Sequence, residues 1–324
     1  MRRRDFIKAI VGSAAAWPPA ARAQQSAVPV IGFLGSTNPI GLAPQIEALR
    51  LGLGDHGYIE GQNIVIEYRW AEGRYDRLPA LAADLVQHRV AVIVTQGTPA
   101  AFAAKQATTT IPIVMAIVGN PVDTGLVLSL ARPGGNITGS SFFIAELSAK
   151  RLEIMKELMP PLARAGALRN PDNPSMLSIV RALTQTAKEI KVALEYIDVR
   201  DLNELEPAIE RARSQFDAIV VLDDGLFVAN RTRIAELAIK NRLPSIGFRE
   251  YCEAGGLAAY GVDFPQIWRG AGALIDKILK GRKPADLPIE QATRFEIILN
   301  LKTAKTLGFD VPPAMSARAN EVIE

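Results

Sequence analysis

The sequence predicts an α/β protein made of two doubly wound units in tandem. Short, nearly continuous apolar runs rich in β-branched residues alternate with helical patterns along the chain. Such runs are typical of strands in a parallel sheet whose two faces are covered by helices. The alternation restarts near residue 136, and a chain of 324 residues with 48% hydrophobic content is large enough for two cores.

The first unit opens with the run VPVIGFLG at residues 28–35, and VAVIVT at 90–95 and IPIVMAIV at 111–118 repeat its apolar character. We expect strands at 28–35, 63–70, 90–95 and 111–118, and helices at 44–56, 75–88 and 99–107. In the first of these helices, Ile46, Leu49 and Leu53 fall on one face. Strands that alternate with helices in this way form right-handed βαβ units.

The second unit continues the alternation to the end of the chain. We expect strands at 136–143, 164–168, 194–199, 218–222, 245–248, 257–260 and 294–300, with helices at 147–158, 175–190 and 264–279 and others between the remaining strands. The sequence KGRKP at 280–284 follows the helix at 264–279. Basic residues, a glycine and a proline in this order are a good helix stop signal.

The first 23 residues, MRRRDFIKAIVGSAAAWPPAARA, have the composition of a cleaved export signal. A basic head precedes an apolar run that is too short to span a membrane, and small residues at Ala21 and Ala23 predict cleavage before Gln24. The head fits the twin-arginine pattern, although a Sec-type signal stays open. We therefore expect a free periplasmic protein, since no lipid-anchor cysteine follows the leader.

Charge and composition exclude several classes of function. The leader holds five basic residues and one acidic residue, so the remaining chain has 32 Lys+Arg against 33 Asp+Glu, which gives no indication of a nucleic-acid partner. Cys252 is the only cysteine, so neither an intrachain disulfide nor a Cys-based metal site is expected. The two histidines, His56 and His88, lie near predicted helix ends, which argues against a Ser–His–Asp triad and a His cluster for zinc.

No cofactor is predicted either. The stretch GLGDHG at residues 52–57 matches the dinucleotide fingerprint, but it ends a helix and precedes a strand, whereas the fingerprint must follow a strand and open a helix. The phosphate-binding P-loop pattern does not occur in the sequence. We therefore expect no catalytic residue, no cofactor and no metal site.

The loops after the predicted strands carry the candidate binding residues. They are short, rich in hydroxyl and amide side chains, and most lead into a helix N-terminus, where free backbone N–H groups favour a carboxylate. In an open parallel sheet, ligands meet the carboxyl ends of the strands. The candidate ligand-binding residues are Ser36, Thr37, Asn38, Gln96, Gly97, Thr98, Asn120, Asn173, Asp223, Asp224, Tyr260 and Asp263.

Each of these loops has an alternative interpretation when it is taken alone, because Ser, Thr, Asn and Asp are ordinary helix N-caps. The set as a whole is what indicates a cleft between two lobes. Asp223 and Asp224 could instead serve an exported, metal-dependent α/β hydrolase as a general base or Mg²⁺ ligands. A ligand-binding sensor subunit that signals through a receptor is a further alternative.

Several stretches of the chain resemble the solute-binding proteins of ABC importers, in particular the tryptophan/tyrosine-type group. The resemblance covers nearly the whole chain after the leader. It is carried by GYIEGQNI at 57–64, RPGGNITG at 132–139, AYGVD at 259–263 and NLKTAK at 300–305, together with the leader and residues 30–33. The last three of the four quoted stretches are the most specific, since they are not generic α/β turn sequences.

The resemblance implies a type I-like periplasmic binding protein with two Rossmann-like lobes and a three-crossing hinge. The N-terminal lobe would comprise residues 28–140 and 262–286, and the C-terminal lobe residues 143–258 and 288–324. The hinge would pass through 140–141, 260–261 and 287–288.

The resemblance also implies roles for the site residues. Thr98 with Ser36 or Thr37 would hold a ligand carboxylate, Asp223 or Asp224 would hold an ammonium group, and Asn173 and Tyr260 would line the cleft. The expected partners are a small solute, a membrane permease and its ATPase, and the protein is expected to act as a monomer.

Overall fold

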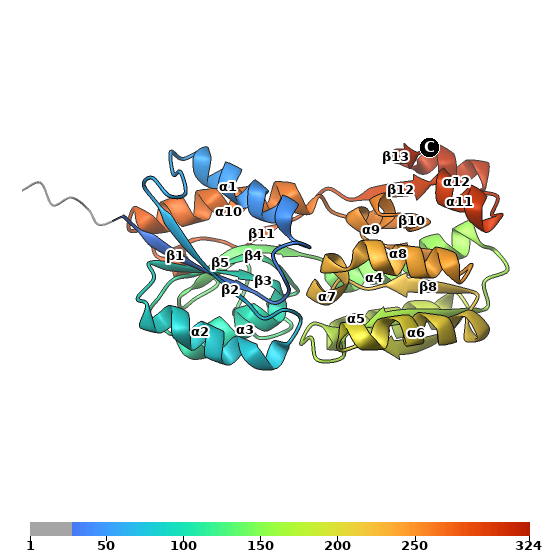
Figure 1. Cartoon of the computed structure of the whole chain (residues 1–324), viewed down its shortest axis with the longest axis horizontal. Coiled ribbons are helices and arrows are strands. Elements are labelled where there is room, and N and C mark those ends of the chain that lie inside the picture. Colours follow the sequence, from blue (N-terminus) through green and yellow to red (C-terminus); the bar gives the residue numbers. More distant parts are fainter. Residues whose placement is uncertain (1–27) are drawn as a thin grey trace, which may run out of the picture.

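The computed structural model describes residues 28–324, which form two lobes side by side, each built on its own mainly parallel sheet (Figure 1). The predicted export signal and its cleavage before Gln24 lie outside the described residues. The predicted pair of doubly wound α/β lobes is confirmed. Between residues 28 and 324, no helix combines the length and the apolar character needed to cross a membrane.

The first sheet has six parallel strands in the order β11-β5-β4-β3-β1-β2. Their bounds are β1 Val30–Gly35, β2 Val65–Trp70, β3 Val92–Gln96, β4 Ile113–Gly119, β5 Ile137–Phe142 and β11 Glu290–Gln291. Helices α1 (Ala43–Gly54) and α10 (Phe264–Leu279) cover one face, and α2 (Leu78–Gln87) and α3 (Gly97–Ala107) cover the other (Figure 1). Short 3₁₀ turns lie at η1 (Tyr75–Arg77) and η2 (Pro284–Asp286).

The second sheet has seven strands in the order β13-β12-β10-β9-β8-β6-β7. Their bounds are β6 Arg164–Arg169, β7 Ala193–Asp198, β8 Ala218–Val221, β9 Ser245–Gly247, β10 Ala258–Gly261, β12 Glu296–Asn300 and β13 Glu321–Ile323. Among the described strands of this sheet, β10 and β12 form the antiparallel pair, and β13 pairs parallel to β12, so β12 and β13 run opposite to the other five strands. The helices of this lobe are α4 Ile144–Leu158, α5 Met176–Glu189, α6 Leu202–Gln215, α7 Gly225–Ala229, α8 Arg231–Lys240, α9 Arg249–Glu253, α11 Leu301–Leu307 and α12 Pro313–Arg318.

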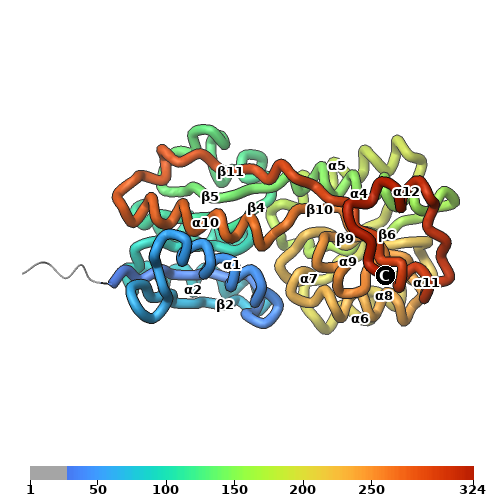
Figure 2. Tube along the Cα trace, turned by 90° about the horizontal axis from the view of Figure 1, so that it is seen from above, coloured from blue at the N-terminus to red at the C-terminus, as the bar shows by residue number. Residues whose placement is uncertain are grey.

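Three chain segments connect the lobes (Figure 2). They follow β5, β10 and β11, and they lie one to several residues beyond the positions expected at 140–141, 260–261 and 287–288. The reason is strand pairing. The third crossing, for example, comes after Gln291, because Glu290 and Gln291 pair with Ser140 and Ser141 at the edge of the first sheet.

Helix α10 returns to the first lobe and packs along α1 (Figures 1 and 2). Two glycines permit this close approach. A Cβ atom on Gly52 would lie 2.0 Å from the Arg269 carbonyl oxygen, and one on Gly272 would lie 2.2 Å from the Gly52 carbonyl carbon. The contact places Phe264 and Trp268 beside the first turns of α1, where they help to form the wall of the candidate site.

Candidate functional site

A cavity lies between the lobes, where loops at the carboxyl ends of β3 and β4 face those after β6 and β8. Its volume is about 60 Å³ when measured at the centres of water-sized spheres. One water occupies about 10–15 Å³ by that measure, so the cavity has room for about four to six waters. The lining residues are Leu42, Gln45, Gln96, Gly97, Thr98, Ile117, Val118, Gly119, Phe142, Ile144, Asn173, Asp223, Asp224, Gly225, Val228, Phe264 and Trp268.

One end of the cavity is polar, and hydrogen bonds between the lobes close it. The Thr98 hydroxyl on α3 lies 2.8 Å from the Ser175 hydroxyl before α5, and both side chains are buried. The side chain of Gln96 turns away from the N-terminus of α3, because its Oε1 accepts from the Ser36 backbone N–H at 3.0 Å. The first turn of α3 has no side-chain cap, and its residues Gly97 and Thr98 line the cavity.

Asp224 is a hydrogen-bonded carboxylate at this end. It accepts from the Leu226 backbone N–H at 2.9 Å, from Asn173 Nδ2 at 2.8 Å, and from the Tyr75 hydroxyl of the other lobe at 2.9 Å. Burial raises the pKa of Asp224 even though these donors oppose the shift. Burial of the hydroxyl and the neighbouring carboxylate raise the pKa of Tyr75 well above its usual value, so Tyr75 remains a donor.

The charge of Asp223 is neutralised by an ion pair with Arg151, whose side chain is fully buried. The guanidinium donates to both carboxylate oxygens, at 2.5 and 3.2 Å, and its Nε donates to the Tyr260 carbonyl at 2.7 Å. The pair therefore links the cavity floor to β10, directly before a crossing between the lobes. With Asp223 paired in this way, Asp224 is the lining carboxylate that has no cationic side chain as a hydrogen-bond partner among the described residues.

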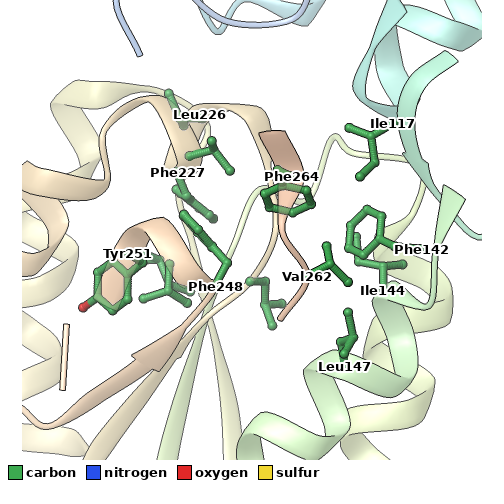
Figure 3. Close-up of a cluster of buried hydrophobic side chains, with 14 of the residues drawn as sticks. Ile117, Phe142, Ile144, Leu147, Leu226, Phe227, Phe248, Tyr251, Val262 and Phe264 are labelled. Carbon is green, nitrogen blue, oxygen red and sulfur yellow. The ribbon is translucent and has the colours of Figure 1, made fainter. Parts of the chain in front are cut away.

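The other end of the cavity is apolar and continues into the core at the hinge. Figure 3 shows Phe264 beside Ile117 and Phe142, with Ile144 next to them. The Phe142 and Phe264 rings meet edge to face, with centroids 5.5 Å apart. Leu42 and Gln45 of α1 and Trp268 of α10 belong to the same lining, and Gln45 is the polar member of this wall.

The cavity brings together six of the twelve predicted residues, namely Gln96, Gly97, Thr98, Asn173, Asp223 and Asp224. Ser36 lies directly behind Gln96, since its hydroxyl donates to the Gln96 carbonyl at 2.8 Å. Thr37 is buried next to it. Neither side chain is part of the cavity lining.

The other four predicted residues have local roles outside the lining. Asn38 accepts from the Gly41 backbone N–H at 2.9 Å, and Asp263 caps α10 through the Gln266 N–H at 3.0 Å. The Asn120 side chain points to Asp123, 3.4 Å away. The Tyr260 ring packs on Phe295, with centroids 6.2 Å apart.

Sequence reasoning missed the apolar wall, Tyr75, Arg151 and Ser175. Gln45 and Trp268 occur within helical patterns that read as ordinary core faces, and they meet only because α10 returns to the first lobe. Arg151 carried a usable signal, because an arginine within the apolar face of a helix requires a buried anion.

The fold is that of the two-lobed solute-binding proteins. The family model described as "ABC transporter substrate binding protein" matches residues 40–323, and the chain belongs to this family. The Tyrosine-binding protein of Clostridioides difficile (strain R20291) is 32% identical over 256 residues, which cover 79% of this chain and 74% of that protein.

Two solved structures of similar identity differ in how well they superpose on this chain. An ABC domain from Streptococcus pneumonia in complex with L-Trp is 27% identical to this chain, with a TM-score of 0.83. The match covers 91% of this chain and 99% of the other chain. The ligand-free, open structure of a substrate binding protein with adhesive properties from Clostridium difficile is 26% identical over the same shares, but its TM-score is 0.62. At nearly equal identity and coverage, this chain therefore superposes better on the L-Trp complex than on the ligand-free, open structure.

Direct contacts between the lobes agree with a closed arrangement. The Arg231 guanidinium of the second lobe donates to the Gly41 carbonyl of the first at 2.8 Å, and a Cβ on Gly41 would lie 2.4 Å from the Cα of Ala229. Together with the Thr98–Ser175 and Tyr75–Asp224 hydrogen bonds, these contacts hold the loops of both lobes around the cavity. Between residues 28 and 324, no group of three or more His, Cys, Asp or Glu side chains is placed to hold a metal ion.

Proposed function

We propose that this chain captures an amino acid with a large apolar side chain in the periplasm and delivers it to the permease of an ABC importer. The observation that carries the proposal is the division of the closed cavity into a polar and an apolar end. The names of the relatives support the same class, since one is a tyrosine-binding protein and another was solved with L-Trp.

The polar end suits an α-amino acid in its zwitterionic form. The uncapped first turn of α3 offers backbone N–H groups to the carboxylate. Asp224 takes the ammonium group, because its carboxylate is buried and has no cationic side chain among its hydrogen-bond partners. The apolar end, with Leu42, Phe264 and Trp268, takes the side chain.

Transport requires binding and closure rather than chemistry from this subunit. A ligand that bridges both lobes gains most of its contacts only when they close, so it shifts the population toward the closed form. The closed monomer then docks on the permease, and the ATPase of the importer drives release. The alternation of open and closed forms uses the three crossings after β5, β10 and β11.

Isothermal titration calorimetry on the mature protein tests the proposal. We expect L-tryptophan, L-tyrosine or L-phenylalanine to bind. Indole-3-propionate, which lacks the ammonium group, and tryptamine, which lacks the carboxylate, should bind at least about 100-fold more weakly. Asp224→Asn should weaken amino-acid binding by about 10- to 100-fold. Asp172→Asn, an exposed carboxylate in the loop before α5, is the matched control and should leave affinity unchanged.

Equal binding of amino acids and of their deaminated or decarboxylated analogues would refute the assignment of the polar end.

Export is tested separately. We propose twin-arginine or Sec-type export, and intact-mass measurement of periplasmic protein should give a chain that begins at Gln24. Retention of residues 1–23 would refute that part.

A further inference from the structure

Gln45 stands apart from the rest of the apolar wall of the cavity. It lies on α1, one turn after Leu42, and faces the cavity lining together with Trp268 of α10. Only 1% of its surface is exposed, and its Oε1 atom has no hydrogen-bond partner among the described residues. A buried acceptor without a partner is rare and costly, because it has given up its hydrogen bonds to water.

A residue of the opposite lobe contacts this amide. Gln45 Nε2 donates to Oε1 of Glu250 on α9, at 3.4 Å. In this arrangement the amide N–H group faces Glu250, and the amide oxygen has no hydrogen-bond partner among the described residues. The contact crosses from α1 to α9, so it forms only when the lobes are closed.

Glu250 is buried as well, and the charged groups that face it are Arg231, Asp223 and Glu253. Burial raises the pKa of Glu250 to about 7. Its carboxyl group lies outside the cavity lining and serves as a support for Gln45. Of these two side chains, Gln45 is the one that lines the cavity and can contact a ligand.

We propose that Gln45 is a specificity-determining residue that accepts a hydrogen bond from the ligand's side chain. The inference rests on the proposed function and narrows it. The ligand is an amino acid whose aromatic side chain carries an N–H or O–H donor, as an indole or a phenol does. An apolar ring of the same shape packs against the apolar wall but leaves the Gln45 amide oxygen buried and without a hydrogen-bond partner. Sites that hydrogen-bond a substrate group discriminate strongly against analogues that lack it.

Matched ligand pairs test this inference on the mature protein. One pair is L-tryptophan and L-3-(3-benzothienyl)alanine, in which sulfur replaces the indole N–H, and the other is L-tyrosine and L-phenylalanine. In calorimetry, the member with the donor should bind about 10- to 100-fold more tightly in each pair that binds. In Gln45→Leu the preference should fall below about threefold, because affinity for the donor ligand drops while affinity for the analogue is kept.

Ile144→Val is the matched control. It alters the same wall without removing a polar atom, so it should change the affinities for both members of a pair by the same factor. Equal affinities within the pairs for the unaltered protein, or an undiminished preference in Gln45→Leu, would overturn the role of Gln45 and leave the proposed function standing. If none of the four amino acids bound, the proposed function would fall, and the inference with it.

Discussion

Replacement of Arg151 by methionine should destabilise the second lobe more than almost any other single change in the cavity floor. Arg151 is fully buried and donates to both Asp223 oxygens and to the carbonyls of Tyr260 and Val221. Removing one member of a buried ion pair costs about 3–5 kcal/mol. Because the two carbonyls also lose their donor, we expect a loss in the upper half of that range, about 4–5 kcal/mol.

Urea unfolding followed by circular dichroism measures this loss, and a double-mutant cycle assigns it to the pair. Asp223→Leu alone should also destabilise strongly, since it leaves Arg151 as an unpaired buried charge. The double variant Arg151→Met/Asp223→Leu should lose at least about 2 kcal/mol less than the sum of the single variants. Lys150→Met on the same helix removes partly exposed contacts with Glu153 and Glu157 and should cost less than about 1 kcal/mol.

The pair would lose its assigned role if Arg151→Met cost no more than Lys150→Met. Additive single variants would equally contradict it, since they would show that Arg151 and Asp223 stabilise the lobe independently. A large loss with strong coupling instead identifies the pair as a support for the cavity floor. Ligand binding in the double variant then separates support from recognition.

Three further predictions concern closure, pH and helix packing. Tyr75→Phe removes the hydroxyl that donates to Asp224 from the opposite lobe. In calorimetry, binding of every ligand should weaken by about 3- to 30-fold at unchanged selectivity. A change confined to one ligand would contradict this prediction. Because the pKa of Glu250 is raised to about 7, the folded state retains a proton that the unfolded state has released. The free energy of unfolding should therefore fall by roughly 3 kcal/mol as the pH rises from about 4.5 to about 7. Urea titrations at several pH values should show that Glu250→Gln abolishes this component. Gly52→Ala should cost at least about 2 kcal/mol, because its Cβ would meet the α10 backbone, whereas Gly54→Ala in the same helix, with open space around it, should change stability by less than about 1 kcal/mol.

The sheets could be predicted from the sequence because each strand is a short apolar run with its own stop signals. Residues 111–118, for example, were expected as a strand, and β4 spans Ile113–Gly119 with every residue buried. The limits of the lobes were harder, since they depend on pairing between distant segments. Glu290 and Gln291 belong to the first sheet only because Ser140 and Ser141 offer them an edge.

The polar half of the candidate site could be predicted for a related reason. Parallel strands bring their carboxyl ends to one edge, so Thr98 and Asn173 were expected near a cleft from their place in the chain alone. The apolar half could not be predicted, because Gln45 and Trp268 look like core residues until α10 is known to pack against α1. Tyr260 was expected at the cleft from its place at a strand end and from the family resemblance, whereas its ring packs on Phe295 and is not part of the cavity lining.

The contacts between the lobes are of two kinds, and the difference determines how a ligand controls closure. The Thr98–Ser175 and Tyr75–Asp224 hydrogen bonds join the lobes directly and stabilise the closed form for every ligand alike. The Gln45 amide oxygen and the first turn of α3 instead lack a side-chain partner in this form, and we expect them to favour closure only when a ligand binds them. A ligand shifts the equilibrium only by the difference between its contacts in the two forms. Affinity therefore depends on both kinds of contact, whereas selectivity depends on the groups that touch the ligand, which include Asp224 and the apolar wall as well as the second kind.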